Sequence, residues 1–294
     1  MKNFFYYLAT VLIWGTSWIG IKMQLGVVEP VVSVAYRFSL AALILLIWCF
    51  ARGLNMRFSL QQHGFIFLQG FCLFGVNYLL FYIAELYIAS GLAAVIFSTI
   101  VLMNIVNGTI FLKAPVDARV VFGGLLGLVG IGLVFRSEIT SVAADGHSFL
   151  GIILSIVATM FSSFGNIISA RNQRNSLPIL QTNAYGMAYG AGVMLLAALI
   201  GGRTFAFDFS PHYIGSLVFL GLFASVIAFG CYLTLIGNIG ADRAAYVTLL
   251  FPVVSLAIST VWEDYRWSGS AASGVLLILF GNLWIIRRRA RAAR

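Results

Sequence analysis

Residues 123–130 read Gly-Gly-Leu-Leu-Gly-Leu-Val-Gly, and residues 274–281 read Gly-Val-Leu-Leu-Ile-Leu-Phe-Gly. The first glycine, the last glycine and three leucines coincide when the chain is shifted by 151 residues against itself. The same gap-free register extends upstream, where it pairs Gly70 with Gly221, Ala93 with Ala244 and Ala94 with Ala245. Because a repeated sequence repeats its structure, this register predicts two equivalent halves.

The composition excludes an ordinary soluble domain. Of the 294 residues, 61% are hydrophobic and only 9% are charged, and the mean hydropathy is +0.99. Soluble domains carry about 25% charged residues. Each apolar run is close to the ~20 residues that a helix needs to cross the ~30 Å hydrocarbon layer, whereas barrel strands are shorter and alternate. The sequence therefore predicts an all-α membrane protein.

Charged, Gly/Pro-containing and Asn-rich interruptions divide the chain into ten predicted spans. They cover residues 4–23, 31–51, 64–84, 91–112, 118–135, 148–170, 179–200, 212–236, 241–261 and 269–286. Five spans per half is an odd number, so the second half enters the membrane from the opposite side and the repeats are inverted. We expect one five-helix repeat at residues 1–137, a second at 138–286 and a basic tail at 287–294. Inverted repeats are the usual basis of alternating access around a site near the midplane.

The positive charges predict the orientation. The formal net charge is +9, and five arginines fall in the tail: Arg287, Arg288, Arg289, Arg291 and Arg294. A nucleic-acid partner is one interpretation of such charge, but a cytoplasmic anchor beside the last span accounts for it. The same side then holds most other basic residues: Lys2, Arg52, Arg57, Lys113, Arg119, Arg171, Arg174 and Arg243. The positive-inside rule predicts a multi-pass inner-membrane protein with both termini cytoplasmic and no nucleic-acid partner.

The residues that usually carry catalysis are scattered. The cysteines lie inside apolar runs without metal-ligand or redox spacing, at Cys49, Cys72 and Cys231. The histidines lie at span ends, away from carboxylates, at His63, His147 and His212. No nucleophile, metal or phosphate motif is present. We therefore expect no enzyme, no cofactor and no metal; a membrane enzyme and a non-transporting scaffold are the competing classes.

Several short motifs resemble the drug/metabolite transporter superfamily in its ten-span EamA-type branch, which includes aromatic amino acid exporters. They are Trp14-Gly15-Thr16, Lys22, Arg37, the run Leu86-Tyr87-Ile88-Ala89-Ser90-Gly91-Leu92-Ala93-Ala94, Pro252, and the glycine pairs Gly123/Gly130 and Gly274/Gly281. The chain departs from the family at residues 111–115 and 261–264, where Leu-Gly-Glu is frequent, and Val101 replaces the proline matched by Pro252. The resemblance covers essentially the whole chain and implies an exporter of amino acids, other metabolites or drugs.

Aromatic residues at helical spacing form a candidate binding face on the third span. They are Tyr78, Phe81 and Tyr82, and Glu85 follows at the end of the span. The shift of 151 residues carries Tyr78 to Phe229 and Phe81 to Tyr232, so both halves offer aromatic faces at equivalent depth. Facing each other, they are suited to stack a planar substrate while tyrosine hydroxyls orient it. The alternative for each residue is core packing or lipid contact.

Polar and charged residues inside the spans are further candidates, because they are costly in lipid. The set comprises Trp14, Trp18 and Lys22 on the first span, Arg37 on the second, and Thr99, Asn166, Tyr246 and Thr248. Lys22 and Arg37 are suited to attract a substrate carboxylate. Alternatively, Arg37 extends to the outer headgroups or pairs with Glu29 or Glu85. Ser, Thr and Asn also serve as interhelical contacts worth about 0.6 kcal/mol each.

The predicted function is a carrier that exports small amphipathic metabolites by alternating access around a central cavity. Amino acids with aromatic or bulky apolar side chains are the expected substrates, because the candidate cavity is aromatic and weakly charged. Multidrug export and export of other metabolites, such as nucleotide precursors, are the alternatives. The partners are then a small-molecule substrate and the lipid bilayer, for a monomer or homodimer. The glycines, including Gly123 and Gly130, pack the fifth span closely, against another span or at a dimer surface.

Overall fold

The computed structural model describes residues 2–113, 118–134, 147–239 and 247–292, and all regular structure in these ranges is helical. The first half contains α1 (Lys2–Lys22), α2 (Pro30–Ala51), α3 (Leu60–Gly70), η1 (Phe71–Val76), α4 (Asn77–Ala84), α5 (Ser90–Phe97), α6 (Ile100–Leu112) and α7 (Ala118–Val134). The second half contains α9 (His147–Arg174), α10 (Ile179–Ile200), α11 (Pro211–Val218), η2 (Phe219–Ile227), α12 (Ala228–Ile239), α14 (Val247–Trp262) and α15 (Gly269–Ala292).

Among the described residues, seven helical segments are long and apolar enough to cross a membrane. They are Lys2–Lys22, Pro30–Ala51, Leu60–Ala84, Ser90–Leu112, His147–Arg174, Ile179–Ile200 and Pro211–Tyr232. Shorter apolar helices cover Leu125–Val134, Leu250–Trp262 and Gly269–Gly281. The predicted all-helical membrane class is thus confirmed, whereas the count of ten spans in two inverted repeats stays a prediction.

Local sequence explains where several helices begin. The third predicted span starts four residues early, at Leu60, because Ser59 and Gln62 form a capping box that satisfies the first backbone N–H groups. Proline occupies the first turn of α2, at Pro30, and of α11, at Pro211, where a missing N–H costs nothing. Gly53 follows the end of α2 in the left-handed region (φ +61°), which only glycine enters without strain.

Two helical segments in equivalent positions contain π-helical turns. η1 covers Phe71–Val76 between α3 and α4, and η2 covers Phe219–Ile227 between α11 and α12. The shift of 151 residues carries 71–76 onto 222–227, inside η2. η1 packs on α9 and α10, whereas η2 packs on α1 and α2. Such turns are rare and concentrate at functional sites.

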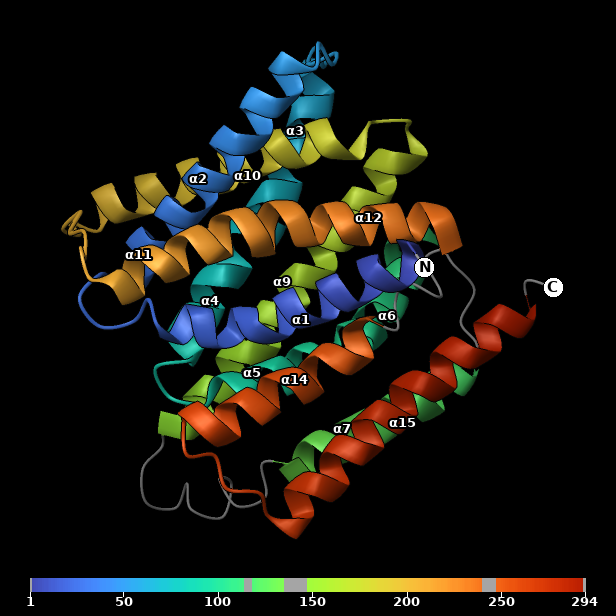
Figure 1. Ribbon diagram of the computed structural model, residues 1–294. Helices are drawn as coiled ribbons and strands as arrows, with labels where there is room; N and C mark the ends of the chain where they lie inside the picture. The colour runs from blue at the N-terminus through green and yellow to red at the C-terminus, as the bar shows by residue number, and fades with distance from the viewer. Residues whose placement is uncertain (1, 114–117, 135–146, 240–246, 293–294) are drawn as a thin grey trace.

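Helices α7 and α15 pack against each other along one edge of the molecule (Figure 1). There is no room for a Cβ atom where the two helices cross. A Cβ on Gly274 would lie 2.5 Å from the Gly130 carbonyl oxygen, and a Cβ on Gly281 would lie 2.6 Å from the Gly123 carbonyl oxygen. These glycines let the two backbones touch. Gly123 and Gly130 thus pack against another span of the same chain, which is one of the two alternatives that the sequence left open.

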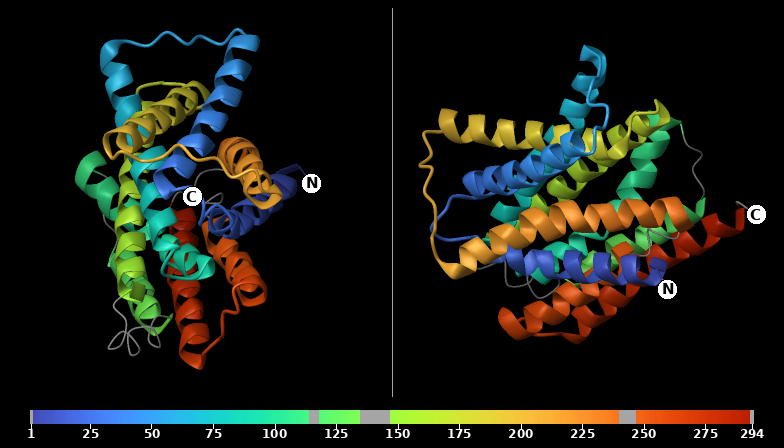
Figure 2. Two further views of the ribbon diagram at one scale, coloured as in Figure 1. Left: turned by 90° about the vertical axis from the view of Figure 1, so that its left-hand side faces the viewer. Right: turned by 45° about the horizontal axis from the view of Figure 1, so that its top comes forward.

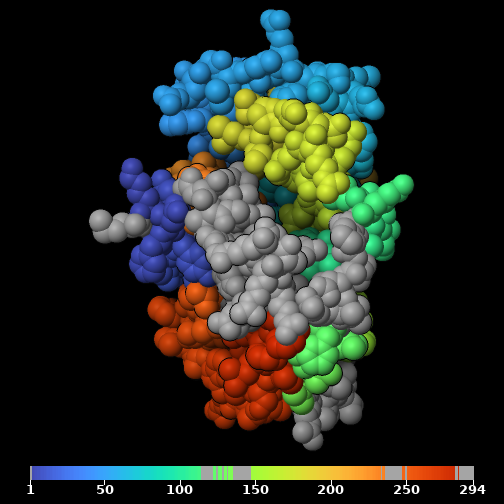
Figure 3. Space-filling view, turned by 90° about the vertical axis from the view of Figure 1, so that its right-hand side faces the viewer, coloured from blue at the N-terminus to red at the C-terminus, as the bar shows by residue number. Residues whose placement is uncertain are grey.

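The remaining helices surround α1 and α9. α1 packs on α14, α12 and α5, and α9 packs on α4, α3 and α6. α2 lies against α10, and the turn at residues 52–59 carries α2 and α3 beyond their neighbours (Figure 2). α1 begins at the same end of the molecule at which α15 finishes, the end that Figure 3 faces. The opposite end, where α1 and α14 finish and α5 begins, holds the charged residues described next.

Candidate substrate site

Arg37 lies in the interior of the helix bundle. Its side chain is only 1% exposed, so it does not extend to the headgroups. The guanidinium carbon lies 4.4 Å from the centre of the Tyr78 ring, and Nε donates to Ser225 Oγ at 3.3 Å. Neither carboxylate considered as a partner pairs with it: Glu29 pairs with Arg203 at 3.2 Å, and Glu85 is not within ion-pair distance. Arg37 Nη1 has no hydrogen-bond partner among the described residues.

Trp14 joins α1 to the second half of the chain. Its indole Nε1 donates to the Ala224 carbonyl in η2 at 3.2 Å. Its ring contacts those of Phe229 and Tyr232, each with centroids 5.2 Å apart. Trp14, Phe229 and Tyr232 are all half-buried. The structure therefore brings three sequence-predicted aromatic residues together, from the first and eighth predicted spans.

Phe74 connects this aromatic group to Arg37. Its centroid lies 5.9 Å from that of Phe229 and 5.6 Å from that of Phe38. Phe38 in turn contacts Tyr78 at 4.7 Å. A continuous series of rings thus runs from Trp14 to the buried guanidinium, and we name it the Arg37 aromatic group: Trp14, Phe38, Phe74, Tyr78, Phe229 and Tyr232.

A second aromatic group surrounds Trp18. Its ring contacts Phe81 at 4.9 Å, Phe97 at 5.6 Å and Phe251 at 6.4 Å. Trp18, Phe81 and Phe251 are buried at 7%, 2% and 1% exposure. Such close packing matches the core-packing alternative better than a surface that a substrate touches. Phe81 and Tyr232, equivalent under the repeat, therefore lie in different surroundings.

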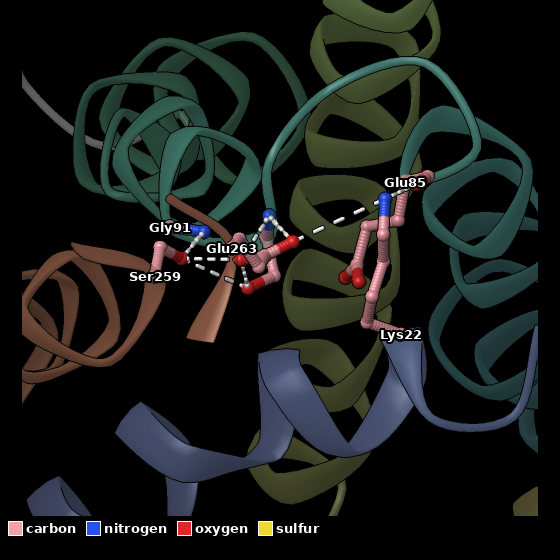
Figure 4. Close-up of polar contacts among 6 residues, drawn as sticks. Lys22, Glu85, Gly91, Ser259 and Glu263 are labelled. Carbon is pink, nitrogen blue, oxygen red and sulfur yellow. Dashed lines mark hydrogen bonds and ion pairs between the residues drawn. The ribbon is translucent and has the colours of Figure 1, made fainter. Parts of the chain in front are cut away.

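Charged and polar groups meet at the end of the molecule where α1 finishes; we name them the Lys22 cluster (Figure 4). Its members are Lys22, Glu85, Ser90, Gly91, Ser259 and Glu263. Lys22 Nζ donates to the Glu85 backbone carbonyl and lies 3.9 Å from Glu263 Oε1. Lys22 therefore links α1 to the ends of α4 and α14.

Glu263 and Ser259 cap the N-terminus of α5. The Glu263 carboxylate accepts from the Ser90 backbone N–H and from its hydroxyl, and Ser259 Oγ donates to Glu263 Oε2 at 2.5 Å. Ser259 Oγ also accepts from the Gly91 N–H at 2.8 Å. A carboxylate at a helix N-terminus satisfies free N–H groups and interacts favourably with the helix dipole. α5 and α14 are thus joined where Lys22 contacts them.

Glu85 is fully buried, and neither of its carboxylate oxygens has a hydrogen-bond partner among the described residues. It lies one residue beyond the apolar segment that ends at Ala84. Burial, followed by the nearby Glu263 carboxylate, raises the pKa of Glu85 well above its ordinary value, while Lys22 and Arg37 act in the opposite direction. One turn earlier, the Tyr82 hydroxyl donates to Gln24 Oε1 at 2.6 Å.

Thr99 and Asn166 make their hydrogen bonds with residues outside these groups. Thr99, in the turn between α5 and α6, donates through Oγ1 to the Ile96 carbonyl of α5 at 2.6 Å, and Asn166 Nδ2 donates to Asn104 Oδ1 at 3.4 Å. Pro252 is buried inside α14 and Thr248 is half-buried there. Tyr246 lies outside the described residues. In the described ranges, no three His, Cys, Asp or Glu side chains converge as a metal site would require.

Residues that the sequence did not single out complete both sites. The shift of 151 residues pairs Phe74 with Ser225, which is a usable signal. Phe74 belongs to the Arg37 aromatic group, and Ser225 accepts a hydrogen bond from Arg37. The predicted spans put Glu263 on the same membrane side as Lys22, which is a second usable signal. Nothing in the spacing indicated that Ser90 and Ser259 would meet across 169 positions of chain.

Comparison with known proteins decides the family. The model of the EamA-like transporter family matches residues 1–136 and 149–287. This chain belongs to the EamA-like transporter family. It is thus a membrane transporter, in agreement with the sequence resemblance, and several of its relatives are named as transporters or as an efflux pump.

Several curated proteins resemble this EamA-like transporter over most of its length. Protein PagO of Salmonella typhimurium is 26% identical, covering 91% of this chain and 86% of its own. The probable amino-acid metabolite efflux pump of Escherichia coli is 22% identical, covering 93% and 91%. The uncharacterized inner membrane transporter YedA of Escherichia coli is 26% identical, covering 86% and 80%. One solved crystal structure shares the fold, with a TM-score of 0.67, 17% identity and 96% coverage of both chains.

Proposed function

We propose that this EamA-like transporter exports amino acids with aromatic or bulky apolar side chains across the inner membrane. The observation that carries the proposal is the state of Arg37, which is buried, has a free Nη1 and pairs with no carboxylate among the described residues. A buried guanidinium is normally paired, because leaving its charge uncompensated is expensive. A substrate carboxylate is the ligand whose geometry the planar guanidinium matches.

The Arg37 aromatic group supplies the apolar part of the proposed site. The half-buried rings of Trp14, Tyr78, Phe229 and Tyr232 retain surface that a substrate side chain can cover. Aromatic contacts of this kind contribute about 0.5–1.5 kcal/mol per ring pair beyond the burial of area. A carboxylate at Arg37 and a planar side chain along the rings together describe an aromatic amino acid. The printed name of the Escherichia coli relative, a probable amino-acid metabolite efflux pump, supports amino-acid metabolites in general.

Transport is proposed to proceed by alternating access between two inverted five-helix repeats. Reciprocal contacts support the repeats: Gly130 meets Gly274 and Gly123 meets Gly281, and the shift of 151 residues exchanges the two pairs. The contact of α1 with α14 likewise corresponds to that of α9 with α6. The π-helical turns and the family match in two segments, 1–136 and 149–287, agree with the same division.

The proposed orientation places both termini in the cytoplasm and the Lys22 cluster on the periplasmic side. It rests on the basic residues near the span ends and on the tail arginines. The printed name of the relative YedA, an inner membrane transporter, supports the choice of membrane. The Lys22 cluster then closes the side toward which an exported substrate leaves.

Flux in proteoliposomes tests the substrate. We expect counterflow of labelled phenylalanine, and much weaker counterflow of phenylalaninamide, which lacks the carboxylate. Arg37→Gln should lower the apparent affinity for the acid about 10- to 100-fold, the equivalent of a charged hydrogen bond, and leave the amide unchanged. Arg203→Gln, at a half-exposed arginine paired with Glu29, is the matched control. Equal transport of acid and amide would disprove the carboxylate site and favour a multidrug exporter.

A further inference from the structure

Glu85 is the charged residue of the Lys22 cluster whose side chain has no hydrogen-bond partner among the described residues, whereas Lys22 and Glu263 both have partners. Lys22 Nζ contacts the backbone oxygen of Glu85 and Oε1 of Glu263, and Glu263 accepts from Ser90 and Ser259. Glu85 itself is 0% exposed, and its two oxygens accept no hydrogen bond among the described residues. An ionised carboxylate without partners is not stable in such a position, whereas a protonated one is tolerated.

We propose that Glu85 is a proton-binding site and that Lys22 moves from Glu263 to Glu85 when this proton is lost. In the proposed closed state Glu85 is protonated. Lys22 then binds Glu263, as it does in the structure, and this contact joins α1 to α5 and to the segment after α14. When Glu85 releases its proton to water entering this end, the new carboxylate attracts the Lys22 ammonium. Lys22 and Glu263 both keep their charges, and the tie between α1 and α14 opens.

The geometry makes this exchange short. Lys22 Nζ already lies at the Glu85 backbone, so the carboxylate of the same residue reaches it by side-chain rotation (Figure 4). Glu263 keeps its hydrogen bonds from the Ser90 N–H and from Ser259 after Lys22 leaves, so the exchange does not leave a second carboxylate without hydrogen bonds. Only the Lys22–Glu263 contact, between α1 and the segment after α14, is broken.

The other groups around Glu85 leave it as the titrating residue. Lys22 from α1 and Arg37 from α2 carry positive charge, and Glu263 comes from the segment after α14. Tyr82, on α4 itself, donates to Gln24. α9 faces this region with Gly151, while its His147 stacks on the Tyr87 ring at 5.8 Å rather than on Glu85. Burial raises the pKa of Glu85, so the closed arrangement is favoured at low pH and loses stability as pH rises through that pKa.

The proposal depends on the proposed alternating access, but it can be tested without any substrate. Spin labels at Met23 and Trp262, both exposed, flank Lys22 and Glu263; the three native cysteines are replaced by alanine. Their separation is measured by pulsed electron paramagnetic resonance from about pH 5 to about pH 8. We expect the long-distance population to grow with pH, its ratio to the short population rising by up to about tenfold per pH unit, the limit for one proton.

Variants at Glu85 and Lys22 identify the groups. Glu85→Gln, which mimics the protonated acid, should hold the short distance at every pH, whereas Glu85→Asp should keep a pH response. Lys22→Gln, which lacks the moving ammonium, should give the long distance without a pH response. Glu29→Gln, at a half-exposed acid paired with Arg203, should behave as the unaltered protein. A pH response that persists in Glu85→Gln or Lys22→Gln, or is missing in the unaltered protein, would overturn the proposal.

Failure of this experiment and failure of the proposed substrate are distinguishable. Distances that ignore pH, combined with phenylalanine counterflow, would reject the proton site and leave the transporter assignment intact. Distances that follow pH, combined with no amino acid flux, would support the proton site and reject the substrate.

Discussion

Gly130 of α7 and Gly274 of α15 touch backbone to backbone, and a Cβ on Gly130 would lie 2.7 Å from the Gly274 carbonyl oxygen. Gly123 and Gly281 make the reciprocal contact one heptad away along the antiparallel pair. The contact joins the last helix of one predicted repeat to the last helix of the other. Because lipid offers no hydrophobic drive for helix association, such close packing provides much of the attraction between them.

Replacing Gly281 by alanine should separate α7 from α15. The new Cβ would lie 2.6 Å from the Gly123 carbonyl oxygen, so the backbones must move apart. We expect a loss of about 1–3 kcal/mol of stability, seen as a lower melting temperature of the purified protein in detergent. Gly127→Ala is the matched control, because a Cβ there meets nothing within 4 Å. Equal melting temperatures for the two variants would contradict the packing argument.

Removing the Tyr78 ring should weaken substrate binding by releasing Arg37. The ring lies 4.4 Å from the guanidinium carbon, and a desolvated cation–π contact of this kind is worth about 2 kcal/mol. Tyr78→Ala is expected to raise the KM for phenylalanine counterflow about tenfold or more. Tyr78→Phe keeps the ring and should stay close to the unaltered protein. If both variants transport normally, the Tyr78 ring does not hold Arg37 for the substrate.

Ser259→Ala should loosen the closed end at the Lys22 cluster. The Ser259 hydroxyl accepts from the Gly91 N–H and donates to Glu263, and a buried donor left without a partner costs about 1–3 kcal/mol. We expect faster maleimide labelling of a cysteine placed at Ile21, which is buried at 2% exposure. Ser273→Ala removes an exposed hydroxyl bonded within its own helix and should leave labelling unchanged. Unchanged labelling in Ser259→Ala would show that this bond does not hold the end closed.

The orientation can be checked at two exposed loop positions. A cysteine at Phe209 should react with an impermeant reagent added to whole spheroplasts, whereas one at Ser176 should react only after the membrane is opened. Phe209 is 81% exposed between α10 and α11, and Ser176 is exposed between α9 and α10. The positive-inside rule is the physical basis, since Arg171 and Arg174 precede Ser176. The opposite labelling pattern would invert the proposed topology.

The membrane class and the helical segments followed from the sequence because hydropathy acts locally. A run such as Val31 to Phe50 must form a helix in lipid, whatever its neighbours are, since every backbone group has to be satisfied within the segment. The shift of 151 residues also marked Gly123, Gly130, Gly274 and Gly281 as special. It did not reveal that they face one another, because a repeat relates equivalent positions and does not identify contacts.

For the candidate site, the sequence indicated some of the residues but not their contacts. Arg37, Tyr78 and Trp14 were recognisable from the sequence, since charges and large amphipathic rings inside spans are conspicuous. The sequence left open whether Arg37 extends to the headgroups or pairs with a carboxylate. The packing of α2 against η2 and α4 decided this, because it places Ser225 and Tyr78 next to the Arg37 side chain. Trp18 and Phe81 carried the same signal as Trp14, yet they are packed in the core.

The sequence by itself determined a helical membrane protein and predicted an internal repeat, because hydropathy and periodicity are properties of the sequence alone. Only the tertiary structure decided that Glu85 is buried without a partner while Lys22 binds its backbone and Glu263. Those three residues come from the ends of α1, α4 and α14, and their meeting depends on how whole helices pack. Electrostatic interactions weaken with the distance between the charges and, in contact with water, are largely screened beyond about 8–10 Å, so a residue's role there is set by position in space rather than by order in the chain.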